Sequence, residues 1–197
     1  MKRRVQVSPV HSAVDAAMKG ARGDAIMFAW GMAEAVSFPV MAEMSQVWLG
    51  VAQPRLLFRR ATAVVAGSVA GVALTHALTR AGARPPAPWT RPGMERATSE
   101  YLGEGASGYW KQALTGIPVK LFAAESGRRG MPTGPVLFHA AGERAARMFS
   151  FTAAIRVLEV PLGRTARRFY GTYLAATGLT FGVLLRKVIR HWEDGGR

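Results

Sequence analysis

Two glutamates and a proline interrupt the apolar run of residues 25–52. The run contains the stretch AEAVSFPVMAE at positions 33–43, in which Pro39 prevents one continuous helix from carrying both Glu34 and Glu43. A carboxylate that is buried without a partner costs several kcal/mol or gives up its charge. We therefore expect both glutamates to line a polar cavity, where a carboxylate can take up and release a proton.

A second apolar stretch is broken in a similar way in the other half of the chain. It reads GIPVK at positions 116–120, so Gly116 and Pro118 interrupt it beside Lys120. Interrupted apolar segments at corresponding places in two halves point to a transporter with its substrate site at mid-membrane depth. The alternative is that both breaks are ordinary helix boundaries near the membrane interface, where charge costs little.

Two arginines follow the second break on a stretch with helical periodicity, residues 135–162. Arg144 and Arg147 are three residues apart, so they share one face of that helix. Guanidinium groups hold phosphate through paired, charge-assisted hydrogen bonds. The alternative is that these arginines pair with Glu143 and Glu159 or reach the lipid headgroups.

The composition is both basic and apolar. Of 197 residues, 26 are Lys or Arg and 12 are Asp or Glu, which gives a net charge of +14, yet 49% are hydrophobic. Basic charge indicates an anionic partner, and together with long apolar runs it favours a membrane protein with cationic loops. The sequence shows no cysteine, metal-ligand cluster, nucleotide-binding glycine motif or nucleophile–base spacing. We therefore expect no metal, no cofactor and no enzymatic activity.

Two apolar runs have the length of membrane spans. Residues 61–79 and residues 169–185 contain no charged side chain. A soluble all-α protein with deeply buried helices is the alternative. Ser8 and Pro9 begin an amphipathic stretch, and residues 81–92 are rich in proline. We expect an N-terminal interfacial segment (residues 1–23), one membrane domain (24–190, with halves 24–80 and 93–190 joined by the linker 81–92) and a polar tail (191–197).

Four stretches, taken in order, resemble the DedA family of membrane proteins (SNARE-associated Golgi proteins with a VTT domain), particularly its small bacterial type. AEAVSFPVMAE (33–43) is similar to the first re-entrant segment of that family, and TGIPVKLFAAESG (115–127) to the second. AGSVAGVALTHAL (66–78) is similar to its glycine-spaced helix, and GERAARMF (142–149) to its Gly-x-Arg-x-x-Arg-x-Phe pattern. Two positions depart from the family: Met41 stands where a second proline is usual, and Lys120 where an arginine is expected.

The resemblance implies an all-α, polytopic protein of the bacterial cytoplasmic (inner) membrane, with transmembrane helices, an N-terminal interfacial helix and two facing re-entrant helical hairpins. The hairpins would turn at Pro39, Gly116 and Pro118. The implied function is transport of a phosphate-bearing lipid, a polyprenyl phosphate or a phospholipid, between leaflets with proton coupling. The implied proton-titrating residues are Glu34 and Glu43, and the implied phosphate-binding residues are Lys120, Arg144 and Arg147.

The implied partners are anionic or phosphate-bearing membrane lipids, with no nucleic acid, and a homo-oligomer is compatible with this reading. Two other functions stay open. One is a non-transporting accessory or assembly protein on the same membrane scaffold, which activity without Glu34 or Arg147 would favour. The other is a soluble basic nucleic-acid-binding protein, which detergent-free solubility and salt-sensitive DNA binding would favour.

Overall fold

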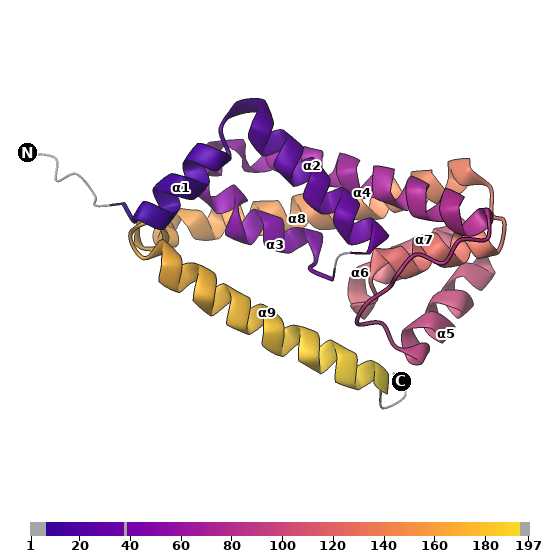
Figure 1. Ribbon diagram of the computed structural model, residues 1–197. Coiled ribbons are helices and arrows are strands. Elements are labelled where there is room, and N and C mark those ends of the chain that lie inside the picture. The colour runs from indigo at the N-terminus through magenta and orange to yellow at the C-terminus, as the bar shows by residue number, and fades with distance from the viewer. Residues whose placement is uncertain (1–6, 38, 194–197) are drawn as a thin grey trace, which may run out of the picture.

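The structure, a computed structural model, describes residues 7–37 and 39–193, and every regular element within these ranges is a helix (Figure 1). The all-α class expected from the sequence is confirmed. The α-helices are α1 (Pro9–Ala17), α2 (Gly20–Val36), α3 (Ala42–Trp48), α4 (Leu57–Arg80), α5 (Pro92–Tyr101), α6 (Gln112–Thr115), α7 (Val119–Arg128), α8 (Thr133–Arg168) and α9 (Tyr170–Glu193). Short 3-10 helices are η1 (Gly50–Ala52), η2 (Pro54–Leu56), η3 (Leu102–Glu104) and η4 (Ala106–Lys111).

The centre of the molecule is the close packing of α2 against α4, with α8 alongside α4 (Figure 1). Glycine makes the α2–α4 approach possible. A Cβ added at Gly31 would lie 2.1 Å from the Val64 carbonyl oxygen, and one added at Gly67 would lie 1.9 Å from that of Phe28. Neither position has room for a side chain, so the two backbones touch, as small residues allow between apolar helices.

Both predicted breaks are present. α2 ends at Val36 and α3 begins at Ala42, so Pro39 lies between two helices. α6 ends at Thr115, where Gly116 adopts a left-handed conformation with φ of 69°. Pro118 then caps the start of α7 in an extended conformation. Local chemistry explains the second break, because glycine ends a helix in this conformation and proline begins the next one.

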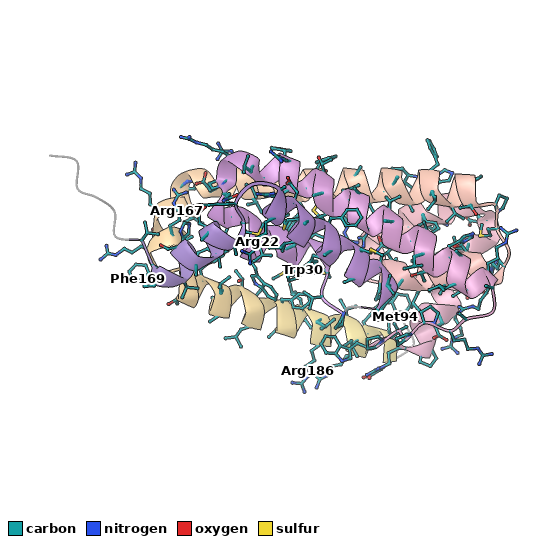
Figure 2. The ribbon with its side chains drawn as sticks, turned by 45° about the horizontal axis from the view of Figure 1, so that its top comes forward. Arg22, Trp30, Met94, Arg167, Phe169 and Arg186 are labelled. Atoms are coloured by element: carbon teal, nitrogen blue, oxygen red, sulfur yellow. The ribbon has the colours of Figure 1, made fainter. Side chains whose placement is uncertain are left out.

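Two helices of the described residues are long and apolar enough to cross a membrane, and they correspond to the two predicted spans. They are the segment Pro54–Arg80, which contains α4, and α9. Their burial differs: 44% of the most apolar 18-residue window is buried in the first, but only 6% in α9. α9 runs along one side of the body, and Arg186 extends outward from it (Figures 1 and 2). Most of its apolar window therefore faces outward, while Tyr170, Phe181 and Trp192 of the same helix are buried.

The N-terminal helix contacts the junction of α8 and α9, and its place at a membrane interface stays a prediction. Pro9 occupies its first turn as predicted, but the Ser8 side chain forms no cap. Instead the Ser8 backbone N–H donates to the Arg167 carbonyl at 3.2 Å. The His11 ring packs edge-on against the Tyr170 ring, with 5.2 Å between the ring centroids. α1 is thus attached to the turn between α8 and α9.

Two predicted boundaries lie elsewhere in the structure. α8 extends beyond the predicted residues 135–162 in both directions, from Thr133 to Arg168, and Pro161 lies inside it without ending it. α9 continues to Glu193, past the predicted start of the polar tail at residue 191. Residues 1–6 and 194–197 of the predicted end segments lie outside the described residues, as does residue 38 in the first break.

Candidate functional site

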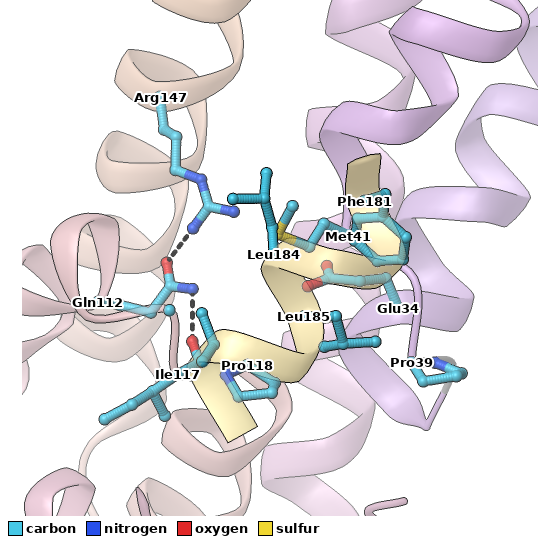
Figure 3. A pocket seen from close by; sticks show the side chains of 12 residues that line it. Glu34, Pro39, Met41, Gln112, Ile117, Pro118, Arg147, Phe181, Leu184 and Leu185 are labelled. Carbon is cyan, nitrogen blue, oxygen red and sulfur yellow. Dashed lines mark hydrogen bonds between the residues drawn. The ribbon is translucent and has the colours of Figure 1, made fainter. Parts of the chain in front are cut away.

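The two interruptions between helices, one at Pro39 and one at Gly116–Pro118, border one cavity. Pro39 from the first break and Pro118 from the second line a cavity of about 90 Å³, together with Glu34 and Arg147. α9 forms another wall through apolar side chains that include Leu184 (Figure 3). Segments from both halves of the chain therefore face the same small, partly polar space.

Lys120 connects the breaks directly. Its amine, on α7, donates hydrogen bonds to the Ser37 carbonyl at 2.9 Å and to the Pro88 carbonyl at 3.2 Å. Ser37 belongs to the first break and Pro88 to the proline-rich linker. The side chain predicted to bind phosphate thus joins three segments of backbone, two of which have no regular structure.

Glu34 and Arg144 form an ion pair, here called the inner pair, in which Arg144 Nη2 donates to Glu34 Oε2. Arg144 Nε also donates to Ser68 Oγ of α4 at 2.9 Å. The Arg144 and Glu34 side chains are only 3% and 6% exposed. The inner pair therefore ties α2, α4 and α8 together, and a buried pair needs such additional hydrogen bonds to offset its desolvation.

Glu43 and Arg147 form a second ion pair, the outer pair, in which Arg147 Nε donates to Glu43 Oε1. Arg147 Nη1 donates to Gln112 Oε1 at 3.1 Å, and Gln112 Nε2 donates to the Ile117 carbonyl at 2.8 Å (Figure 3). The Arg147 side chain is 18% exposed. The outer pair thus links α8 to both breaks while one arginine remains accessible from the cavity.

An apolar groove of about 400 Å³ continues from the cavity past Arg147. The cavity and the groove share Met41, Gly116, Arg147, Phe181 and Leu184 as walls. The groove is otherwise lined by side chains of α3, α6, α8 and α9: Glu43, Met44, Val47, Ala113, Phe151, Thr177 and Thr180. Mostly apolar walls with a few placed polar groups are typical of ligand sites. Arg147 of the outer pair lines both spaces, and Glu43 lines the groove.

The charged residues named from the sequence come together in this site, and so do the residues of the predicted turns. The two arginines, however, are not free: each holds a carboxylate in the place where phosphate was expected. The alternative pairing with Glu159 is wrong, because Glu159 binds Arg156 at 2.7 Å and Arg167 at 3.1 Å. The roles of Glu34, Glu43, Lys120, Arg144 and Arg147 in transport stay predictions.

Sequence reasoning missed three contributors to the site: Ser68, Gln112 and the inner face of α9. Ser68 lies between two glycines in an apolar helix, and Gln112 is an amide just before the second break. For Ser68, a polar residue in an apolar stretch was the available signal, and for Gln112 it was the position close to the second break. For Phe181 and Leu184 there was none, because a uniformly apolar helix does not reveal which face lines a groove.

Within residues 7–37 and 39–193, no three His, Asp or Glu side chains are grouped as a metal site requires. No protein family, curated protein or solved structure matches the chain.

Proposed function

We propose that this chain is an integral protein of the cytoplasmic (inner) membrane that moves a phosphate-bearing lipid between leaflets, with proton uptake coupled to binding of the phosphate. The DedA resemblance suggests this function, and one observation carries it. An accessible arginine that already holds an anionic group, Arg147, stands between a small, partly polar cavity and a larger apolar groove.

The membrane placement is supported by α9. Only 6% of its most apolar window is buried, and Leu179 and Val183 are 73% and 57% exposed. Water is a poor solvent for such a helix, whereas hydrocarbon is a good one. The interrupted backbone around Pro39 and Pro118 fits the same placement, because broken helices are tolerated at membrane depth where they line a cavity.

The outer pair supports recognition of phosphate. Carboxylate and phosphate both accept the paired hydrogen bonds of a guanidinium group, so a phosphate can replace Glu43 on Arg147. The displaced Glu43 would then be a buried charge without a partner, and taking up a proton removes that cost. Phosphate binding and proton uptake are coupled by this exchange, and lower pH favours the lipid-bound state.

The groove supports an amphiphilic substrate. A headgroup on Arg147 places the adjoining tail among Met44, Val47 and Phe181. α9 forms one wall of this part of the groove: Thr177 and Phe181 line the groove, while Leu179 lies on the exposed face. A tail can therefore pass beside α9 into the bilayer while the headgroup stays in the polar cavity.

The test is translocation in proteoliposomes. Purified protein should move a labelled phosphate-bearing lipid between leaflets but not a lipid with the same tails and no phosphate. Arg147→Lys keeps the charge but loses the forked geometry, and one charge-assisted hydrogen bond contributes ~1.5 kcal/mol, so the rate should fall about tenfold. Arg156→Lys is the matched control on α8, because Arg156 also pairs with a glutamate but is 46% exposed.

Three outcomes would count against the proposal. Equal movement of both lipids, or equal rates in Arg147→Lys and Arg156→Lys, would remove phosphate recognition at Arg147. A folded, membrane-inserted protein that moves neither lipid would favour the non-transporting accessory function.

The membrane placement has its own test. The protein should stay in membranes through an alkaline carbonate wash. Because the chain has no cysteine, single cysteines are clean probes. In native membranes, Met41→Cys and Ala113→Cys should react with a water-soluble thiol reagent, since Met41 lines the cavity and the groove and Ala113 lines the groove, and lipid-facing Leu179→Cys should not. Release by carbonate, or labelling of Leu179→Cys alone, would overturn the placement.

A further inference from the structure

One buried carboxylate belongs to neither ion pair. Glu143 on α8 is 1% exposed, and neither of its carboxylate oxygens has a hydrogen-bond partner among the described residues. The nearest opposite charge that pairs with it is Arg147, with Nη1 3.9 Å from Glu143 Oε1. A buried carboxylate so poorly compensated either costs several kcal/mol or is neutral.

Arg147 lies between two carboxylates that compete for it. Glu143 precedes it by one helical turn, and Glu43 approaches it from α3. Arg147 Nε donates to Glu43, and Nη1 is occupied by Gln112 at 3.1 Å. Glu43 keeps one oxygen, Oε2, without a partner. The Arg147 guanidinium group therefore bonds one oxygen of Glu43 and leaves Glu143 without a hydrogen bond.

The surrounding charges do not supply another partner. Glu143 faces Glu43 from α3, Glu34 from α2, and Arg144 and Arg147 of its own helix. From α6 the facing group is the neutral amide of Gln112, and from α4 it is the hydroxyl of Ser68, bonded to Arg144. The Lys120 amine is hydrogen-bonded to two backbone carbonyls. Two guanidinium groups thus meet three carboxylates, and each guanidinium already bonds one.

We propose that Glu143 is a proton-binding site, and that Glu43 and Glu143 share one proton through Arg147. While Arg147 pairs with Glu43, the proton resides on Glu143. When the Glu143 O–H bond breaks, the proton passes to Glu43 and the new Glu143 carboxylate takes Arg147 from Glu43. Because Glu43 lies on α3, which follows the first break, and Glu143 lies on α8, the exchange loosens the connection between α3 and α8.

The proton site itself does not depend on transport, but its use in coupling rests on the proposed function. When both carboxylates are protonated, neither holds Arg147 as a counter-charge, and Arg147 remains at the junction of cavity and groove, where a phosphate can reach it. The two carboxylates then titrate as one coupled pair, and the pH response belongs to the pair rather than to either residue.

Infrared spectroscopy of purified protein tests the assignment without any lipid substrate. The wild type should show the carbonyl stretch of a neutral carboxylic acid near neutral pH, where exposed carboxyls are ionised. Glu143→Gln should lose this band entirely, because Glu43 stays ionised on Arg147. Glu43→Gln should lose it as well, because Arg147 then pairs with Glu143 and ionises it. Glu104→Gln, at a side chain that is 65% exposed, should leave the band unchanged.

Each result decides the proposal. The substitutions keep size and shape, and elution of each variant at the wild-type volume checks folding. Absence of the band in the wild type, or its persistence in Glu143→Gln, would overturn the proton site. Persistence in Glu43→Gln alone would overturn the sharing through Arg147. Since no lipid is present, loss of the transport proposal leaves these outcomes untouched, and the reverse also holds.

Discussion

The inner and outer ion pairs join the same parts of the molecule, the region of the first break and α8, but they differ in what surrounds them. Arg144 of the inner pair is 3% exposed and is held by Ser68, whereas Arg147 of the outer pair is 18% exposed and lines both the cavity and the groove. A second carboxylate, that of Glu143, lies 3.9 Å from Arg147 Nη1. We infer from this difference that the two pairs have different roles. The inner pair holds the helices together, and Arg147 of the outer pair exchanges one anionic partner for another.

The largest expected effect separates the pairs by stability. Glu34→Gln leaves the buried Arg144 charge without a counter-charge, and breaking a buried pair in this way costs about 3–5 kcal/mol of unfolding free energy. Glu43→Gln should cost much less, because Arg147 is partly exposed and can turn to Glu143. Chemical unfolding of both variants in the same detergent measures the difference. Equal losses of unfolding free energy in the two variants would mean that the inner and outer pairs stabilise the fold equally.

Asp24, near the start of α2, pairs with Arg59 and Arg60 of α4. The pH dependence of this third contact can be compared with that of the inner and outer pairs. Burial alone would raise the pKa of Asp24, but hydrogen bonds and charge from Arg59 and Arg60 outweigh it and hold that pKa below its usual value. A lowered pKa means that the pair stabilises the fold above the usual pKa of a carboxyl and that this contribution disappears as the pH falls.

Asp24→Asn should therefore cost about 1.5 kcal/mol near neutral pH, the size of a hydrogen bond to a charged group, and the gap from wild type should close on acidification. Unfolding curves across the acidic range measure that gap. Glu104→Gln is the control, since its partner Lys111 is exposed and the pair should contribute little. A gap that stays constant with pH would remove the assigned linkage.

The smallest effect concerns the groove that only the outer pair borders. Leu184 on α9 lines both the cavity and the groove, so Leu184→Ala removes apolar contact with the tail and should weaken lipid binding by about 1 kcal/mol, roughly fivefold. Leu179→Ala removes the same atoms from the outward face of α9 and should have no effect. The half-saturating lipid concentration for translocation compares them. Identical values would argue that the tail lies elsewhere.

The fold was predictable where local chemistry decides it. Proline and glycine end helices through their own backbone restrictions, so the breaks at Pro39 and at Gly116–Pro118 follow directly from residue type. The two long apolar helices follow from unbroken runs of apolar residues. The attachment of α1 to Tyr170 was not predictable, because nothing in an amphipathic stretch says whether protein or lipid covers its apolar face.

The site was predictable in its members but not in its pairing. A charged residue inside an apolar run can be recognised from the sequence as a candidate site residue, because a buried charge needs a partner. The partners are another matter: Arg144 and Glu34 are 110 residues apart, and Arg147 and Glu43 are 104 apart. Only tertiary packing decides which carboxylate meets which arginine, and therefore which one, Glu143, is left without a hydrogen bond.

The measurement that tests the central claim most directly is the pH profile of phosphate-lipid translocation by the double variant Glu43→Gln/Glu143→Gln. In the wild type, both carboxylates compete with phosphate for Arg147 once they are ionised, so the rate should fall as the pH rises. Without them Arg147 has no titrating competitor, and the account predicts a rate that no longer varies with pH. A profile that still falls with pH as in the wild type would contradict the exchange of carboxylate for phosphate at Arg147.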